Sequence, residues 1–412
     1  MKTKSVKYHS YENQHILLQL LAILLISRLF MLIMVPVYNG IMGTDRTFSF
    51  LMNEWDAKRY QFMVDNGYTF PWDYDPQANW AFFPMYMLVC AAVKAVTFWK
   101  ADTYYVGMLV SNVCIYVAAF TTVRYIRDIT SDGSYGDTLK NLTEKKILGG
   151  ICSKDVLLVG FLMFAAPYTF YCSSMYTEAM FIMFISLFFY FCNRKKFLTA
   201  GIMAAFASGT RIVGCTLVFP LIIEMYRYYQ PGRVSFAGVK EFIVKVIQKP
   251  VDLLSILVCP LGTFTYMAFL RVFCGDVWAF LHVQIAWRED EYFPVLGVMW
   301  KACTGQIEPR YTYMGWFCVG VFVMYGYMLA KKHYSMAIFG IISLLVPLAS
   351  HVMSTCRFTI GSYVIFIGFY DLLGRMRGSR AKDILRWIII AVFIALETLL
   401  LFMWYNSDCW LM

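Results

Sequence analysis

The chain has 412 residues, of which 60% are hydrophobic and only 15% are charged, and its mean hydropathy is +0.58. Soluble globular domains carry about a quarter charged residues and slightly under half apolar residues, so this composition excludes a water-soluble globule. The apolar residues fall in runs of about twenty, the length that a helix needs to cross a hydrocarbon core of ~30 Å. None of the runs alternates with a period of two, which argues against a transmembrane barrel. We predict an all-α, polytopic bundle of transmembrane helices.

The formal net charge of +10 does not indicate a nucleic-acid partner. The basic residues stand in short tracts between apolar runs, and not on one helix face with interleaved aromatic residues. The twelve cysteines lie mostly inside apolar runs, with no CxxC pair and no Cys/His ligand spacing, so they are typical of small buried hydrophobic residues. We therefore expect neither a nucleic-acid surface nor a metal site.

Lysine and arginine on short loops indicate the cytoplasmic side of a membrane protein. One orientation places all six basic tracts on that side, and it requires eleven spans with the C-terminus outside. The tracts are residues 2–7, 124–154, 194–196, 227–249, 331–332 and 375–386. The spans are predicted near residues 15–37, 104–124, 156–172, 174–191, 197–212, 214–227, 251–272, 313–331, 335–351, 358–373 and 387–405.

This orientation holds only if the apolar segment 82–99 does not cross the membrane, so we predict a re-entrant or interfacial helix there. The segment 197–227 is short for two spans, and a re-entrant hairpin is the alternative. The outer surface then carries two aromatic-rich loops, residues 38–103 and 273–312. There is no internal repeat and no soluble domain, so residues 1–412 form a single membrane domain.

The first outer loop contains the unusually polar segment NEWDAKRY at residues 53–60. A carboxylate among aromatic side chains at a membrane surface suits general-base catalysis, which makes Asp56 a candidate catalytic residue. The alternative is that Glu54, Asp56, Lys58 and Arg59 form solvated ion pairs on one helix face.

Three further charged residues lie at predicted outer ends of apolar spans. Glu178 begins one span and is either functional or a helix-capping acid. Arg211 and Arg357 suit the binding of phosphate oxygens through a planar fork, although either could snorkel or pair with Glu178. Arg28 lies roughly 18 Å into the first span, and we expect it to face a buried partner such as an outer-loop acid.

Five motifs follow one another along the chain: Glu54-Trp55-Asp56-Ala57, Gly67-Tyr68, Ala81-Phe82-Phe83-Pro84, Tyr176-Thr177-Glu178, and Thr210-Arg211 with Gly214. Together they resemble the GPI mannosyltransferase 2 family, also called the PIG-V family. The resemblance covers residues 53–84 and 171–214, and more loosely Trp287 and residues 354–357. That family belongs to the GT-C glycosyltransferases. These polytopic enzymes take a hexose from a polyprenyl-phosphate donor and use an acidic residue of the first outer loop.

The resemblance implies a role for each matching residue. Asp56 would be the catalytic base and Glu178 a second catalytic acid. The donor phosphate would be bound by Arg211, Arg357 and Arg59. The sugar substrates would contact Trp55, Tyr60, Trp80 and Tyr176.

The sequence departs from the family where Thr-Arg-Ser-Asn-Gly reads Thr-Arg-Ile-Val-Gly at residues 210–214 and where the outer loops are shorter. These departures favour a bacterial-type relative in the plasma membrane over a GPI enzyme of the endoplasmic reticulum, which is the location expected of a eukaryotic member. The implied partners are polyprenyl-phosphate hexose, a glycolipid or glycan acceptor and membrane lipids, with no cofactor beyond the lipid-linked donor.

Two other functions compete with the transferase. A lipid or ion transporter would use Arg28, Glu397 and the outer acids as a pathway, but the chain shows no related halves. A noncatalytic scaffold subunit would not need the large aromatic outer loops. No Walker A sequence, GxGxxG after a strand, or HExxH is present, so nucleotide-driven and zinc-hydrolase chemistry have no support.

Overall fold

The computed structural model describes residues 2–71, 78–131, 153–232, 234–286, 295–349, 351–376 and 379–411, and over these residues it is helical throughout, with no strand. The predicted all-α fold class is therefore confirmed. The elements are α1 (Lys2–Met42), α2 (Phe48–Met52), α3 (Asp56–Asn66), η1 (Asn79–Ala81), α4 (Pro84–Val96), α5 (Thr103–Ser131), α7 (Ser153–Phe164), η2 (Thr169–Ser173), α8 (Glu178–Asn193), α9 (Phe197–Ser208), η3 (Ile212–Leu217), α10 (Val218–Tyr229), α11 (Phe236–Gln248), α12 (Pro250–Val258), α13 (Leu261–Cys274), α14 (Ala279–His282), η4 (Val283–Ala286), α15 (Val295–Cys303), α16 (Arg310–Ala330), α17 (Tyr334–Leu348), α18 (Thr355–Gly361), α19 (Val364–Arg375), α20 (Arg380–Tyr405) and η5 (Cys409–Leu411).

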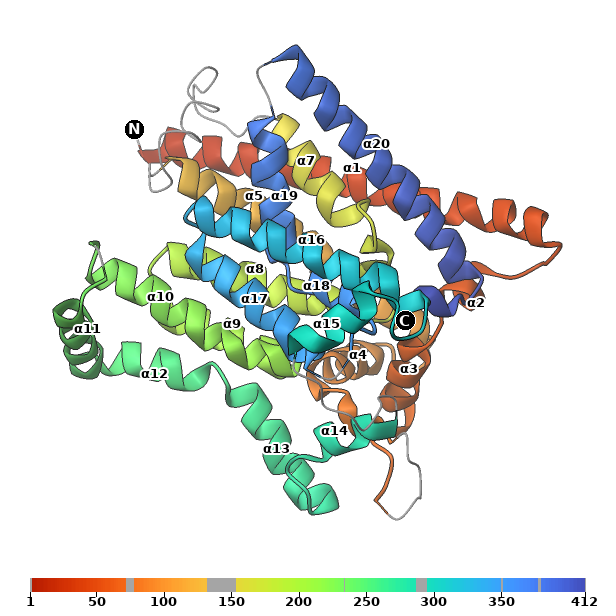
Figure 1. The fold of residues 1–412 in the computed structure, drawn as a ribbon, viewed down its shortest axis with the longest axis horizontal. Coiled ribbons are helices and arrows are strands. Elements are labelled where there is room, and N and C mark those ends of the chain that lie inside the picture. The colour runs from red at the N-terminus through yellow and green to blue at the C-terminus, as the bar shows by residue number, and fades with distance from the viewer. Residues whose placement is uncertain are drawn as a thin grey trace.

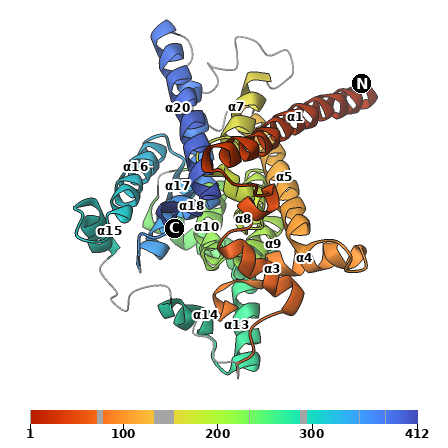
Figure 2. The ribbon, with the colours of Figure 1, turned by 90° about the vertical axis from the view of Figure 1, so that its right-hand side faces the viewer.

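The helices form a bundle with two distinct ends (Figure 1). The N-terminus and α11 lie at one end, and α2, α3, α15 and the C-terminus lie toward the other. Figure 2 looks onto this second end and shows α8 and α10 inside the ring made by α1, α5, α13 and α16. We call the first end the basic end and the second the site end, for reasons given below.

Five helices of the described residues are long and apolar enough to cross a membrane, and seven if each of two bent pairs counts as one span. The bends measure 52° between α12 and α13 and 76° between α18 and α19. Helix α4 has 13 residues, or about 20 Å of helix, which is short of the ~30 Å core and agrees with a non-spanning segment. The total of eleven spans stays a prediction. The single-span candidates are Asn13–Met42, Thr103–Ile129, Ile212–Tyr229, Arg310–Ala330 and Arg380–Tyr405.

Contacts link the basic tracts, or residues directly beside them, to one another at one end of the bundle. Each contact joins one tract to the next, so all six lie near each other, as the predicted orientation requires. This shared location is the reason for the name basic end. The linking contacts are Arg124 with Asn13, Arg194 with Asp128, Lys195 with Tyr228, Ser335 with Glu224, and His333 with Asp371.

Arg28 faces the protein, as expected, but its hydrogen-bond partners are not the acidic residue that we expected. Its Nε donates to Asn112 Oδ1 of α5 at 2.7 Å, and its Nη1 lies 3.3 Å from the Phe164 carbonyl oxygen at the end of α7. The same Nη1 donates to Ser27 Oγ at 2.7 Å, while Nη2 is buried without a hydrogen-bond partner among the described residues. Arg28 therefore ties α1 to α5 and α7.

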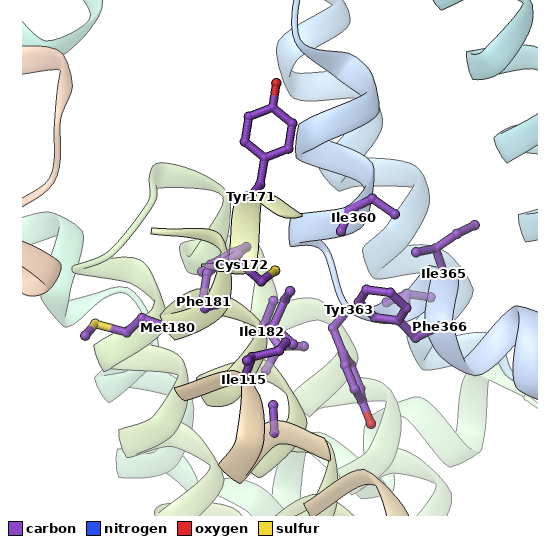
Figure 3. Packing of buried hydrophobic residues seen from close by; sticks show 14 of the residues in the cluster. Ile115, Tyr171, Cys172, Met180, Phe181, Ile182, Ile360, Tyr363, Ile365 and Phe366 are labelled. Carbon is purple, nitrogen blue, oxygen red and sulfur yellow. The ribbon is translucent and has the colours of Figure 1, made fainter. Parts of the chain in front are cut away.

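A dense apolar core supports the site end from below (Figure 3). Ile115 of α5, Phe181 of α8 and Tyr363 between α18 and α19 are buried and point into the same region. Between helices in a membrane such side chains stabilise the bundle through close van der Waals packing rather than through removal from water. This packing fixes the starts of α8 and α18 relative to each other.

Candidate functional site

Four charged side chains from four separate segments meet at the site end. Arg357 Nη1 of α18 donates to Asp56 Oδ2 of α3 at 2.6 Å. Arg211 Nη1, from the link between α9 and η3, donates to Glu178 Oε1 of α8 at 2.6 Å. Arg357 Nε lies 3.2 Å from the same Glu178 oxygen, so the four residues form one network in which two positive and two negative charges balance.

The side chains of the network differ in solvent exposure, from fully buried to partly exposed. The Glu178 side chain is 1% exposed, Arg357 is 14% exposed and Asp56 is 29% exposed. The second carboxylate oxygen of Glu178 is buried and has no hydrogen-bond partner among the described residues. Glu178 therefore forms the floor of the site, and Asp56 is the carboxylate that an entering molecule meets first.

Both acids begin helices. Asp56 is the first residue of α3 and Glu178 the first residue of α8, where the positive end of the helix dipole favours a carboxylate. Glu178 thus occupies the helix start that the capping interpretation expects and also pairs with arginine, while its functional role stays a prediction. The burial of Glu178 alone does not distinguish a helix-capping role from a functional one.

Glu54 forms the ion pair within the first loop that the alternative interpretation expected, although its side chain is only 11% exposed, whereas Asp56 pairs with Arg357 of α18. Glu54 Oε2 accepts from Lys58 Nζ at 2.7 Å, one helical turn away, and the Lys58 side chain is 59% exposed. Asp56 instead reaches across to α18. The two acids therefore have different partners although they are two residues apart.

Two of the nine described residues other than glycine that have a positive φ lie beside this site. Trp55, directly before Asp56, has φ +49°, and Ser354, directly before α18, has φ +61°. Such left-handed conformations in residues other than glycine cost of order 1 to 3 kcal/mol and are concentrated at functional sites. Here they start the two helices that present Asp56 and Arg357.

Aromatic rings hold the two arginines in place. The Arg357 guanidinium lies 5.4 Å from the Tyr176 ring centroid and 5.1 Å from that of Phe358, and Arg211 lies 4.8 Å from the same Phe358 ring. A cation over an aromatic face gains about 0.5 to 2 kcal/mol, more when water is excluded. The rings therefore leave the outward edges of the guanidinium groups as the places where an anion can bind.

The predicted aromatic site residues adjoin this network in different ways. Tyr176 Oη donates to the Glu54 carbonyl at 2.9 Å, and Tyr60 Oη donates to Thr177 Oγ1 at 3.5 Å. Burial raises the pKa of the Tyr60 hydroxyl and the nearby Asp56 raises it further, so this phenol stays protonated. These two tyrosines thus position α3 against the start of α8.

The remaining predicted residues lie at the edge of the site. The Trp55 ring meets Trp404 edge-on at 4.9 Å. Trp80 Nε1 donates to the Thr69 carbonyl at 2.9 Å, and its own contacts are within the outer loop and with α13. Arg59 is half-buried on α3, three residues after Asp56. Trp287 lies outside the described residues.

Sequence reasoning missed three residues of the site and misjudged a fourth. Tyr171 lies 5.8 Å below the Arg357 guanidinium, Phe358 contacts both arginines, and Trp404 packs on Tyr171 at 4.9 Å. Glu397, considered only for transport, accepts the Phe170 backbone N–H at 3.0 Å and so anchors η2. Phe358 could have been found from its position beside Arg357, but the others carry no sequence signal.

Among the described residues, no three His, Cys, Asp or Glu side chains stand close enough to hold a metal ion together. The cationic part of the site is supplied by the two arginines. In comparisons with known proteins, no family model matches this chain, and no curated protein matches it. The geometry of the site is therefore the main guide to function.

Proposed function

We propose that the protein is a GT-C-type membrane glycosyltransferase. It moves a hexose, by its PIG-V resemblance mannose, from a polyprenyl-phosphate donor to a lipid-linked or surface glycan acceptor. The observation that carries this proposal is the meeting of Asp56 with Arg357, Glu178 and Arg211 at one end of an apolar bundle. A candidate base and two phosphate-binding cations are the groups that this reaction needs.

The apolar bundle suits a donor whose lipid tail stays in the bilayer while its phosphate reaches the site end. Arg357 and Arg211 bind the phosphate oxygens through their planar guanidinium groups. Asp56 removes the proton of the acceptor hydroxyl as that oxygen attacks the anomeric carbon. The bond from the anomeric carbon to the phosphate oxygen breaks, and the phosphate leaves with the electron pair. This single displacement inverts the anomeric centre.

Glu178 has a separate task in this scheme. Its buried carboxylate lies against both arginines and fixes their positions before any substrate enters. Preorganised charges cost no reorganisation at the moment of reaction. Glu178 therefore acts on the phosphate through the arginines, while Asp56 acts on the acceptor.

The pairing of Asp56 with Arg357 gives the two substrates a fixed order of action. The Asp56 carboxylate accepts a hydrogen bond from Arg357, so the two side chains hold each other until another anion binds the guanidinium. A donor phosphate competes for the same guanidinium and releases Asp56. Donor binding thus precedes activation of the acceptor, because Asp56 can act on the acceptor only after the donor phosphate has taken its place on Arg357.

The acceptor distinguishes two versions of the proposal. A GPI mannosyltransferase of the endoplasmic reticulum would carry Ser and Asn where this chain has Ile212 and Val213. We favour an acceptor other than a GPI precursor, at the plasma membrane of a prokaryote. The transporter alternative loses support because Arg28 and Glu397 hold other segments of the protein through hydrogen bonds.

The decisive experiment combines two measurements. Purified protein in liposomes is incubated with radiolabelled polyprenyl-phosphate mannose or glucose and extracted glycolipids, and transfer to acid-stable products is counted. Mass spectrometry then compares glycolipids and surface glycans of cells with and without the gene. We expect hexose transfer in the first and loss of one hexose-containing species in the second. Absence of transfer from every donor together with an unchanged glycan profile would contradict the proposal.

A further inference from the structure

A second site lies at the basic end of the bundle. A cavity of about 360 Å³ opens where the turn between α8 and α9, the end of α10 and the start of α12 meet. Its wall carries Lys195, Lys249, Tyr228 and Tyr229. Helix α8 begins at Glu178 and ends just before this cavity, so its 16 residues place the cavity about 24 Å from the four-residue network.

The two lysines offer their ammonium groups to this cavity. Lys195 Nζ lies 5.9 Å from the Tyr228 ring centroid, and Lys249 Nζ donates to Tyr229 Oη at 2.9 Å. The Tyr229 hydroxyl donates in turn to the carboxylate of Asp252. An ammonium has three donors, so both lysines keep hydrogens for an oxyanion, while the carboxylate of the cavity wall already has a hydrogen-bond donor.

Helix α11 indicates what kind of molecule carries the oxyanion. It lies across the ends of α10 and α12 (Figure 1) and has exposed apolar side chains, among them Phe236 at 90% and Ile247 at 62%. Lys240 and Lys245 lie on the same helix. An exposed apolar stripe with neighbouring lysines is typical of a helix that lies in the headgroup plane with its apolar face among acyl chains.

We propose that the cavity binds the phosphate of an anionic phospholipid in the leaflet at the basic end. Helix α11 sets the depth of the cavity in the leaflet. Its apolar face must reach the acyl chains, and Lys249 follows directly after its last residue. Lys195 and Lys249 then meet the headgroup phosphate from two sides. A free phosphate ion offers the same chemistry to the lysines but has no acyl chains to lie beside α11. This site is independent of the transfer reaction.

The test uses the full-length protein in an uncharged detergent. Dioctanoyl phosphatidylglycerol, dioctanoyl phosphatidylcholine or inorganic phosphate is titrated, and the apparent affinity is taken from the rise in the unfolding midpoint. We expect phosphatidylglycerol to raise the midpoint at concentrations where the other two have little effect. A lysine near an anionic headgroup contributes roughly five-fold in affinity. K195Q with K249Q should therefore weaken the affinity for phosphatidylglycerol roughly twenty-five-fold.

The matched control is K332Q with K382Q, which removes two exposed lysines of the same end that neither line the cavity nor lie on α11. It should change the affinity by less than about three-fold. Should the cavity double variant fail to fold, K195Q alone alters only an exposed turn residue and should weaken the lipid about five-fold. Equal losses in the cavity and control variants, or a wild-type response to phosphatidylcholine or inorganic phosphate as strong as that to phosphatidylglycerol, would overturn the proposal.

Discussion

Arg357 donates a hydrogen bond to Asp56 over 2.6 Å, although 301 positions separate the two residues in the chain. The pair joins the first outer-loop helix α3 to the short helix α18, and its Asp56 side chain is the most exposed of the four in the network. A molecule that enters the site therefore meets a carboxylate and a guanidinium that already hold each other.

Replacing Asp56 by Asn tests the base directly. The amide keeps the size of the side chain but cannot take the acceptor proton, so kcat should fall roughly a hundred-fold or more. The KM for the donor should not rise, because Arg357 becomes freer to bind phosphate. Steady-state transfer assays in liposomes measure both constants.

Glu54→Gln is the matched control, because it removes one carboxylate from the same segment while leaving the Asp56–Arg357 pair intact. Its ion pair with an exposed lysine is worth at most about 1 kcal/mol, and turnover should stay near the wild-type rate. A stable Asp56→Asn protein with wild-type turnover would remove the catalytic assignment.

Replacing Arg211 by Ala should weaken donor use. Truncating one partner of a buried charge pair costs about 2 to 5 kcal/mol, but Arg357 still lies beside Glu178 and keeps that carboxylate compensated. We expect a folded protein whose donor KM rises strongly, with partial rescue in Arg211→Lys because a point charge cannot reproduce the fork. Arg194→Ala, which breaks an ion pair with Asp128 at the basic end, should leave donor KM unchanged. Normal donor KM in Arg211→Ala would assign Arg211 a structural role.

Gly214 follows Arg211 by three residues, and the structure leaves no room for a side chain there. A Cβ at this position would come within 2.4 Å of the backbone at Ala207 and Ser208, so Gly214→Ala must shift η3 away from α9. Such overpacking costs about 1 to 3 kcal/mol and should displace Arg211. Gly374→Ala in α19, where a Cβ meets nothing within 4 Å, should be neutral or slightly stabilising. Thermal unfolding with donor titration checks both, and equal midpoints for the two variants would contradict the steric argument.

The sequence was most informative where physical chemistry makes a residue unusual. Apolar runs required helices, and a charge at the end of an apolar run is costly unless it has a function or a partner. That logic identified Glu178, Arg211 and Arg357, while Asp56 was identified from its aromatic surroundings in a polar loop segment. Neither signal could show that Arg357 pairs with Asp56, because nothing in the local sequence of either residue records a contact across 301 positions.

The supporting residues were hidden for two other reasons. Aromatic residues make up 18% of the chain, so Tyr171 and Trp404 look like every other ring until packing singles them out. The left-handed backbone at Trp55 and Ser354 falls on residue types that rarely adopt it, so no turn motif predicts it. Tertiary contacts impose these conformations, and only the structure reveals them.

The orientation in the membrane can be tested with a native cysteine. Cys409 is exposed and belongs to η5, beside the C-terminus at the site end. If the basic end faces the cytoplasm, a membrane-impermeant maleimide added to intact cells should label the wild type but not a variant in which Cys409 and the partly exposed Cys215, Cys274 and Cys303 are all replaced by Ser. A Lys240→Cys change in that serine variant should be labelled only after the membrane is permeabilised. The reverse pattern would place the site on the cytoplasmic side.

The last prediction tests whether Glu397 is a hydrogen-bond acceptor or part of an ion pathway. Glu397 is buried in α20, and its Oε1 accepts the Phe170 N–H at 3.0 Å and the Thr169 hydroxyl at 3.2 Å. Through η2 it positions Tyr171, whose ring lies beside Arg357. Glu397→Gln keeps an acceptor oxygen at that place, so stability and transfer should stay close to wild type.

Glu397→Leu instead leaves the Phe170 N–H buried without an acceptor, which costs about 1 to 3 kcal/mol. It should lower the unfolding midpoint and reduce transfer through displacement of η2. A transporter that moves protons or ions through Glu397 needs its ionisable carboxylate, so Gln would be as damaging as Leu. Transfer rates and unfolding midpoints of the two variants therefore test whether Glu397 acts as a hydrogen-bond acceptor, and a Gln variant as inactive as the Leu variant would show that the protein needs its ionisable carboxylate.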